Sequence, residues 1–110
     1  MVDRLPYHRR EFMLGMQGVK LTINAYNAFE NNANGRSCFR LGNRLFDIRV
    51  FESIWDMGFL ETVGFSGVEL ANYTIALSDK GKRCVQFIRE SVYDYKRTLL
   101  FDDEKLIPGT

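Results

Sequence analysis

A short stretch of the chain concentrates side chains of the types that bind nucleic acids. Its members are Arg36, Arg40, Asn43, Arg44 and Arg49. A guanidinium group can donate paired hydrogen bonds to guanine or hold a phosphate, and an asparagine amide can pair with adenine. Only one acid, Asp47, interrupts the stretch. The pattern favours an anion-binding surface, and the alternative is a solvated face with local salt bridges, such as Arg49 with Glu52 or Asp56.

A second basic cluster lies near the N-terminus. It contains Arg4, His8, Arg9 and Arg10. We interpret residues 1–18 as an arm or helix whose Arg4, Arg9 and Arg10 could contact phosphates, or as a charged end without a partner. Binding by such an arm would depend on charge and would weaken steeply with salt.

The sequence argues against catalysis and against a bound metal or cofactor. His8 is the only histidine, and it lies far from Cys38 and Cys84, so no zinc-ligand spacing is present. The glycines form no phosphate-binding loop, and no serine or cysteine has a recognisable general base. We therefore expect a binding protein without cofactor or metal, and not an enzyme.

Composition is that of one globular domain of 110 residues, with 45% hydrophobic and 26% charged residues. The net charge of +1 hides an asymmetry, because residues 1–49 are basic and residues 50–110 are acidic. No apolar run is long enough for a membrane span, and no signal peptide is recognisable. We expect a cytoplasmic protein with two reduced thiols.

The hydrophobic pattern predicts a mostly helical chain with one hairpin. The expected helices cover residues 7–16, 22–33, 37–41, 44–57 and 80–99, and the expected strands cover 59–63 and 73–77. Residues 19–23 alternate as in a strand, but we favour a helix from Thr22. The last helix carries an apolar stripe, and residues 101–110 are expected to form a flexible tail.

Two segments carry a resemblance to a known family: IWDMGFLE at 54–61 and YTIALSDKGK at 73–82. In the second, Ser78 or Asp79 can cap a helix, and Gly81 allows the first turn to approach a strand closely. With the order of elements, these segments resemble the winged helix-turn-helix superfamily of bacterial and archaeal regulators. The resemblance implies a single α+β, mostly α domain with a β-hairpin wing and a long C-terminal helix. It also implies binding of double-stranded DNA.

The predicted wing departs from a DNA-binding pattern. Residues 64–72 contain no lysine or arginine, although a wing that grips DNA usually needs a cation. Phe65 and Val68 would instead form a small apolar contact for a protein partner, or Phe65 would fold back onto the hairpin.

The terminal helices could form a homodimer, as the resemblance implies, or could pack within the monomer. The aromatic and methionine residues concerned are Phe12, Met13, Met16, Phe87, Tyr93 and Tyr95. The leading hypothesis is a small homodimeric transcriptional regulator that binds DNA, and the rival is a winged-helix protein-interaction module that does not. The DNA hypothesis requires the arginines of the first cluster to form one contiguous, solvent-facing ridge whose guanidinium groups are not tied up by neighbouring carboxylates.

Overall fold

A computed structural model describes residues 2–24, 30–31, 37–66, 72–91 and 94–106 of the chain. The helices are α1 (Tyr7–Gly15), α2 (Ile48–Asp56), α3 (Asp79–Glu90) and the short 3-10 helix η1 (Asp103–Leu106). The strands are β1 (Asp3–Leu5), β2 (Leu21–Asn24), β3 (Glu30–Asn31), β4 (Ser37–Leu41), β5 (Arg44–Asp47), β6 (Leu60–Ser66), β7 (Asn72–Leu77) and β8 (Leu99–Phe101).

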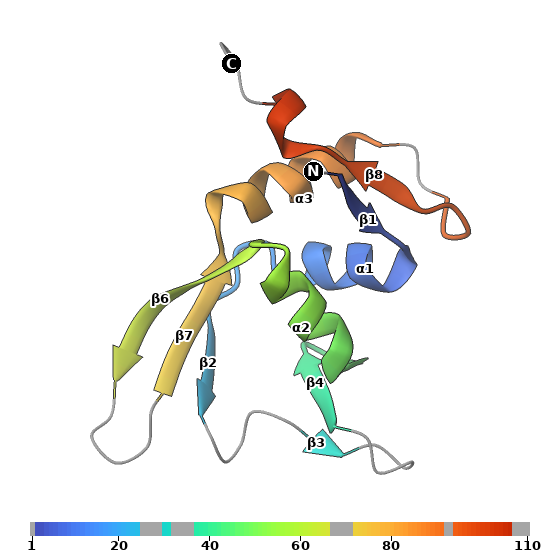
Figure 1. Cartoon of the computed structure of the whole chain (residues 1–110). Coiled ribbons are helices and arrows are strands. Elements are labelled where there is room, and N and C mark those ends of the chain that lie inside the picture. Colours follow the sequence, from blue (N-terminus) through green and yellow to red (C-terminus); the bar gives the residue numbers. More distant parts are fainter. Residues whose placement is uncertain (1, 25–29, 32–36, 67–71, 92–93, 107–110) are drawn as a thin grey trace.

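The described strands form three small antiparallel sheets around the helices (Figure 1). One sheet has the order β2-β7-β6, the second has the order β3-β4-β5, and β1 pairs with β8 in the third. The α+β class is therefore confirmed.

The hydrophobic core lies where α1, α2 and α3 meet the starts of β6 and β8. Phe59 and Phe101 pack with ring centroids 5.9 Å apart, and Phe12 meets Phe46 edge-on at 5.3 Å. The largest fully buried side chains are Leu5, Phe12, Met13, Met16, Ile54, Phe59, Cys84 and Phe101. Each helix buries one apolar stripe in this core, which explains the spacing of these residues in the sequence.

A tight backbone junction connects the end of α2 to the start of α3. The backbone N–H of Ser78 donates to the carbonyl of Phe59 at 2.9 Å, and Ser78 Oγ accepts from the backbone N–H of Gly81 at 3.1 Å. Gly58 ends α2 with a φ of +80°, a left-handed conformation that favours glycine. The predicted stop at Gly58 and the predicted cap at Ser78 are both confirmed.

The predictions of the first helix and of the hairpin are confirmed. α1 matches the helix expected over 7–16 and begins after Pro6, as a first-turn proline favours. β6 and β7 match the two expected strands and pair with each other.

The predicted helix over 37–41 is wrong, and so is the predicted helix over 22–33 at its described residues, 22–24 and 30–31. Residues 21–24 form β2, which pairs with β7 in the register Leu21↔Ile75, and residues 30–31 form β3. β4 pairs with β5 across a two-residue turn at Gly42, whose φ is +62°. Pairing with partners distant in sequence overrode local helix propensity at β2, and Gly-Asn is a known hairpin turn.

Two long helices were also predicted beyond their true ends. α2 begins only at Ile48, after strand β5, because the Asp47 side chain accepts from the backbone N–H of Arg49 and caps the helix. α3 ends at Glu90 instead of residue 99, and β8 then returns to pair with β1.

Residues 101–106 pack on the domain instead of forming the flexible tail expected from the sequence. Phe101 is fully buried, and its ring lies 5.3 Å from that of Phe87. Arg83 on α3 donates to both carboxylate oxygens of Asp103, at 2.6 and 2.8 Å. This hydrogen bonding lowers the pKa of Asp103, so the carboxylate stays charged at neutral pH.

Most of the described residues expected at a dimer interface belong to the core of the monomer. Phe12, Met13 and Met16 are buried, and Phe87 is partly buried against the core, so these side chains pack within the monomer. Tyr95 is exposed, and Tyr93 lies outside the described residues. Packing within the monomer accounts for Phe12, Met13, Met16 and Phe87, and the homodimer stays a prediction.

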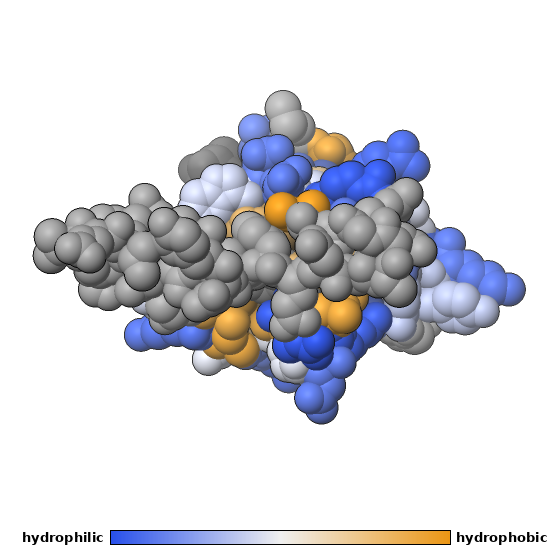
Figure 2. All heavy atoms as spheres, turned by 90° about the horizontal axis from the view of Figure 1, so that it is seen from below, coloured by the Kyte–Doolittle hydropathy of each residue, from blue (hydrophilic) through white to orange (hydrophobic). Residues whose placement is uncertain are grey.

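On the face drawn in Figure 2, the visible hydrophobic residues lie among hydrophilic ones. Within the described ranges, no helix has the length and apolar character needed to cross a bilayer.

The junction predicts that Gly81 cannot be replaced. A Cβ at this position would overlap the carbonyl oxygen of Phe59, which is backbone and cannot move aside. We expect Gly81→Ala to lower the free energy of unfolding by about 2 kcal/mol or more, despite the better helix propensity of alanine. Urea denaturation measures this. Gly64→Ala is the control, since its Cβ would meet Thr74 at an ordinary 3.4 Å; equal losses would contradict the prediction.

Candidate functional site

The predicted arginine ridge does not form as one surface. The register of β4 and β5 pairs Arg40 with Leu45 and Leu41 with Arg44. Because directly paired residues share a face and neighbours along a strand alternate, Arg40 and Arg44 lie on opposite faces of this hairpin. Asn43 lies in the exposed turn between them, and Arg36 lies outside the described residues.

Carboxylates hold the two arginines that follow the turn. Arg44 Nη1 donates to Glu11 of α1 at 2.8 Å, and Arg49 Nε donates to Asp47 at 3.0 Å. The hydrogen bond from Arg49 to Asp47 also raises the pKa of this guanidinium, which stays cationic. The alternative of a solvated face with local salt bridges named Glu52 or Asp56 as an example of a partner for Arg49, and the structure shows Asp47 in that place.

The structure instead brings parts of both basic clusters together around a shallow hollow of about 510 Å³. Arg9 reaches it from α1, Arg44 from β5 and Arg49 from the first turn of α2. The other lining residues are His8, Leu45, Phe46, Asp47, Val50 and Ser53. Three guanidinium groups from three elements thus surround one solvent-open depression.

Arg10 does not contribute to this surface, contrary to the prediction of a phosphate-binding arm. Its side chain is only 3% exposed. Arg10 Nη2 donates to the backbone carbonyls of Asp94 at 2.8 Å and of Arg97 at 2.7 Å. Its role is to fix the turn at 94–97 against α1.

Aromatic rings connect that turn to the hollow. Tyr7 meets Tyr95 edge-on with ring centroids 6.2 Å apart, and the Arg44 guanidinium lies 5.9 Å from the Tyr7 ring. Lys96 lies 5.7 Å from the Tyr95 ring, and Arg9 Nη1 donates to the carbonyl of Arg4 at 2.9 Å. These contacts make one continuous surface.

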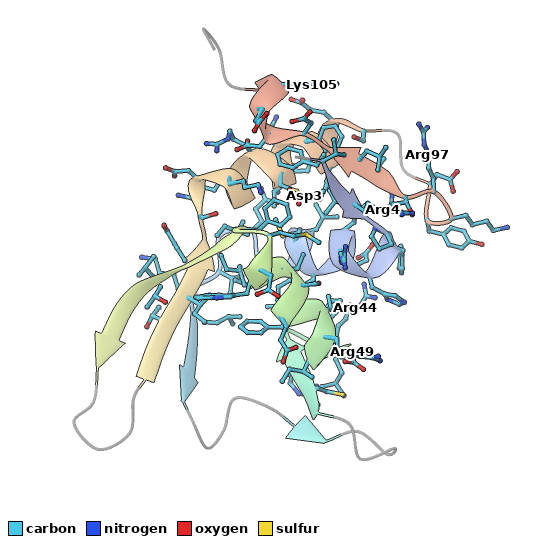
Figure 3. All side chains as sticks on the ribbon, viewed as in Figure 1. Asp3, Arg4, Arg44, Arg49, Arg97 and Lys105 are labelled. Carbon is cyan, nitrogen blue, oxygen red and sulfur yellow. The ribbon has the colours of Figure 1, made fainter. Side chains whose placement is uncertain are left out.

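We call this surface the basic face. Its cations are Arg4, Arg9, Arg44, Arg49, Lys96 and Arg97, and its carboxylates are Glu11, Asp47 and Asp94. Figure 3 shows Arg97, Arg4, Arg44 and Arg49 following one another along the same side of the molecule. Cations outnumber carboxylates here, in a protein whose net charge is only +1.

Sequence reasoning missed Lys96 and Arg97 because it placed them inside a long helix. A signal for the turn was available: the Asp94 side chain accepts from the backbone N–H of Lys96 at 3.0 Å, a local bond typical of aspartate in turns. Tyr95, expected on the apolar stripe of that helix, is 57% exposed.

The remaining predicted contacts lie elsewhere. Val68 is outside the described residues, and for Phe65 only the backbone is described, within β6. In the described parts of the chain, histidine, cysteine and acidic residues form no group suited to a metal ion. Cys38 and Cys84 are buried and form no disulfide, as predicted.

No family model matches the chain, and neither a curated protein nor a solved structure is significantly similar to it.

The hydrogen bonds of the buried Arg10 should stabilise both the folded protein and the turn at 94–97. In Arg10→Met the two turn carbonyls lose their donor, so we expect the free energy of unfolding to fall by about 2 kcal/mol. Amide exchange in residues 94–97 should accelerate. Arg89→Met, on the exposed side of α3, removes the same charge and should have little effect. Equal stability of the two variants would show that Arg10 does not hold the turn.

The thiols should resist modification in the folded protein. Burial and, secondarily, the nearby Asp3 carboxylate raise the pKa of Cys84 to about 12, so its reactive thiolate is scarce at neutral pH. We expect negligible reaction of either cysteine with Ellman's reagent at pH 8, and reaction of both after unfolding in guanidinium. Rapid native-state labelling would contradict the described burial.

Proposed function

We propose that the chain is a DNA-binding protein that holds duplex DNA through the basic face, which takes the place of the single arginine ridge that the sequence predicted and that does not form. The observation that carries this proposal is the convergence of Arg9, Arg44 and Arg49 around one solvent-open hollow. Cations spaced over several elements suit the repeated phosphates of a duplex, which dominate the affinity of DNA-binding proteins. The cations of the 94–97 turn extend the same surface.

The carboxylate partners do not prevent such binding. The Arg44 side chain remains 48% exposed in its pair with Glu11, and the Arg49 side chain remains 70% exposed in its pair with Asp47. Exposed ion pairs contribute little to stability because water screens them. A phosphate can therefore replace either carboxylate at a small cost in free energy. Before DNA binds, the ion pair keeps each guanidinium extended.

A winged-helix arrangement is part of the proposal, with α2 as the helix that enters the groove. Support comes from α2 leading directly into the hairpin β6–β7, whose second strand pairs with β2. In place of the short helix typical of a helix-turn-helix, the described residues before α2 form β4 and β5. We therefore assign the phosphate contacts to the basic face. The biological role that fits is a small transcriptional regulator.

One observation favours the rival function, docking on another protein. The described parts of the hairpin, residues 60–66 and 72–77, carry a single charged residue, Glu61, and expose Val63. Such a surface offers nothing to a phosphate and could contact an apolar partner.

Fluorescence anisotropy with a labelled mixed-sequence duplex separates the two functions. We expect the wild-type chain to bind at about 50 mM KCl and to lose affinity steeply by about 200 mM. In Arg9→Gln/Arg49→Gln, affinity should fall and the slope of log K against log salt should become shallower by about 2, one unit for each lost phosphate contact.

The matched control is Arg89→Gln/Lys105→Gln, which removes the same charge from α3 and η1. It should bind DNA as the wild type does. Equal losses in both double variants would mean that net charge alone acts and would overturn the assignment to the basic face. No wild-type binding at low salt would overturn the DNA proposal and leave the protein-docking function.

A further inference from the structure

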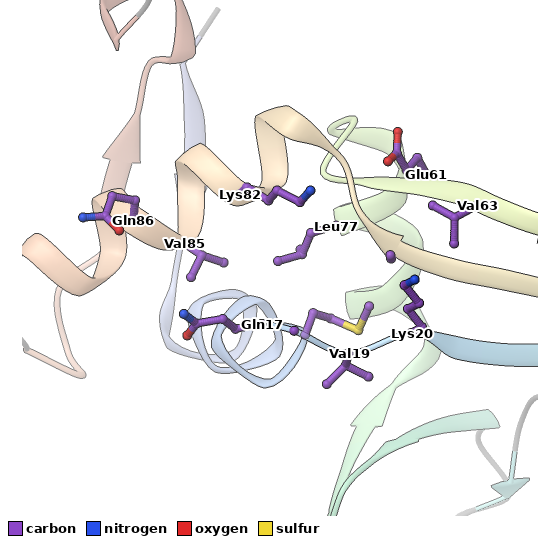
Figure 4. A pocket seen from close by; sticks show the side chains of 12 residues that line it. Gln17, Val19, Lys20, Glu61, Val63, Leu77, Lys82, Val85 and Gln86 are labelled. Atoms are coloured by element: carbon purple, nitrogen blue, oxygen red, sulfur yellow. The ribbon is translucent and has the colours of Figure 1, made fainter.

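A second hollow, of about 570 Å³, shares no residue with the basic face. It lies between the end of α1, the segment leading into β2, the sheet strands β6 and β7, and the first half of α3 (Figure 4). Its volume falls within the range of small-molecule sites, roughly 300–1,000 Å³.

The floor of this groove is apolar. Met16 just after α1, Leu77 of β7 and Val85 of α3 line it and are almost fully buried. Val19 and Val63 form its walls, and Val63 is 46% exposed. An apolar body placed here would rest on the three buried side chains and remove the exposed surface of Val19 and Val63 from water, which favours binding.

Two lysines from different elements flank the floor. Lys20 precedes β2 and Lys82 lies in the first turns of α3; Figure 4 shows them extending from opposite sides, with Leu77 between them. Both are exposed, and neither forms an ion pair with a residue in the described ranges. Glu61 is the only acid that lines the groove among described residues, and its carboxylate points away from Leu77 in this view.

We propose that this groove binds a small amphipathic organic anion, with its alkyl or aromatic body on the apolar floor and its carboxylate between Lys20 and Lys82. The apolar floor favours the apolar body of the ligand, and the ammonium groups of Lys20 and Lys82, which have no ion-pair partner among the described residues, favour its negative charge. A neutral ligand of the same shape would leave both lysines without an anion, and a cationic ligand would be repelled. The inference does not depend on the DNA-binding proposal.

Decanoate is a suitable probe, because it joins an apolar chain to one carboxylate. Titration of the full chain below the micelle concentration, followed by nitrogen-15 chemical shifts, should perturb the amides of Val19, Val63 and Val85. We expect 1-decanol, which lacks the charge, to bind about tenfold more weakly, the ratio that corresponds to 1.4 kcal/mol.

Lys20→Gln/Lys82→Gln should lose about tenfold in decanoate affinity while keeping the fold. The control Lys96→Gln/Lys105→Gln removes the same charge away from the groove and should bind as the wild type does. The proposal is overturned if decanoate causes no shifts in the groove at millimolar concentration, if decanol binds as tightly, or if both double variants bind decanoate equally.

Discussion

The close approach of Gly81 to the backbone of Phe59 is the constraint on which the rest of the structure depends. It allows the first turn of α3 to lie directly on the chain as it leaves α2, where Ser78 Oγ donates to the carbonyl of Gly58 at 2.6 Å and accepts from Gly81. Any side chain at 81 would separate these segments. Because β7 ends at this point, the same contact sets the position of the whole hairpin relative to the helical core.

The junction also connects β1, and through it β8, to the core. Lys80 Nζ donates to the carbonyl of Met57 at 2.6 Å and lies 3.0 Å from Asp3, an ion pair beside the Phe59 ring. Asp3 belongs to β1, which pairs with β8 and so fixes the residues that follow α3. Arg10 then holds the 94–97 turn to α1. The basic face is therefore assembled from segments that the core positions: four of its six cations lie on helices and strands, and Lys96 and Arg97 lie on the turn that Arg10 holds.

Local signals could predict those parts of the fold that local interactions determine. The cap at Ser78, the stop at Gly58 and the need for glycine at 81 follow from backbone geometry over a few residues, and the sequence indicates all three. β2 could not be assigned the same way, because its partner β7 lies about fifty residues later.

At the site, Arg9, Arg44 and Arg49 were identified, but the separation of Arg40 from Arg44 depends on strand register. α3 was predicted too long because hydrophobic residues after Glu90 continue the helical spacing by coincidence.

Asp47 pairs with Arg49 in a way that still leaves this guanidinium able to bind an external anion. The Asp47 side chain accepts from the backbone N–H of Arg49 as well as from its guanidinium, so the carboxylate caps α2 whether or not the guanidinium stays. If Arg49 moved to an external phosphate, Asp47 would keep one hydrogen-bond donor and the helix would keep its cap. Arg44 has a similar second support, since the rings of Tyr7 and Phe46 lie within 6 Å of its guanidinium whatever anion it binds. The charges of the basic face are thus held in place by contacts that a bound anion does not need to break.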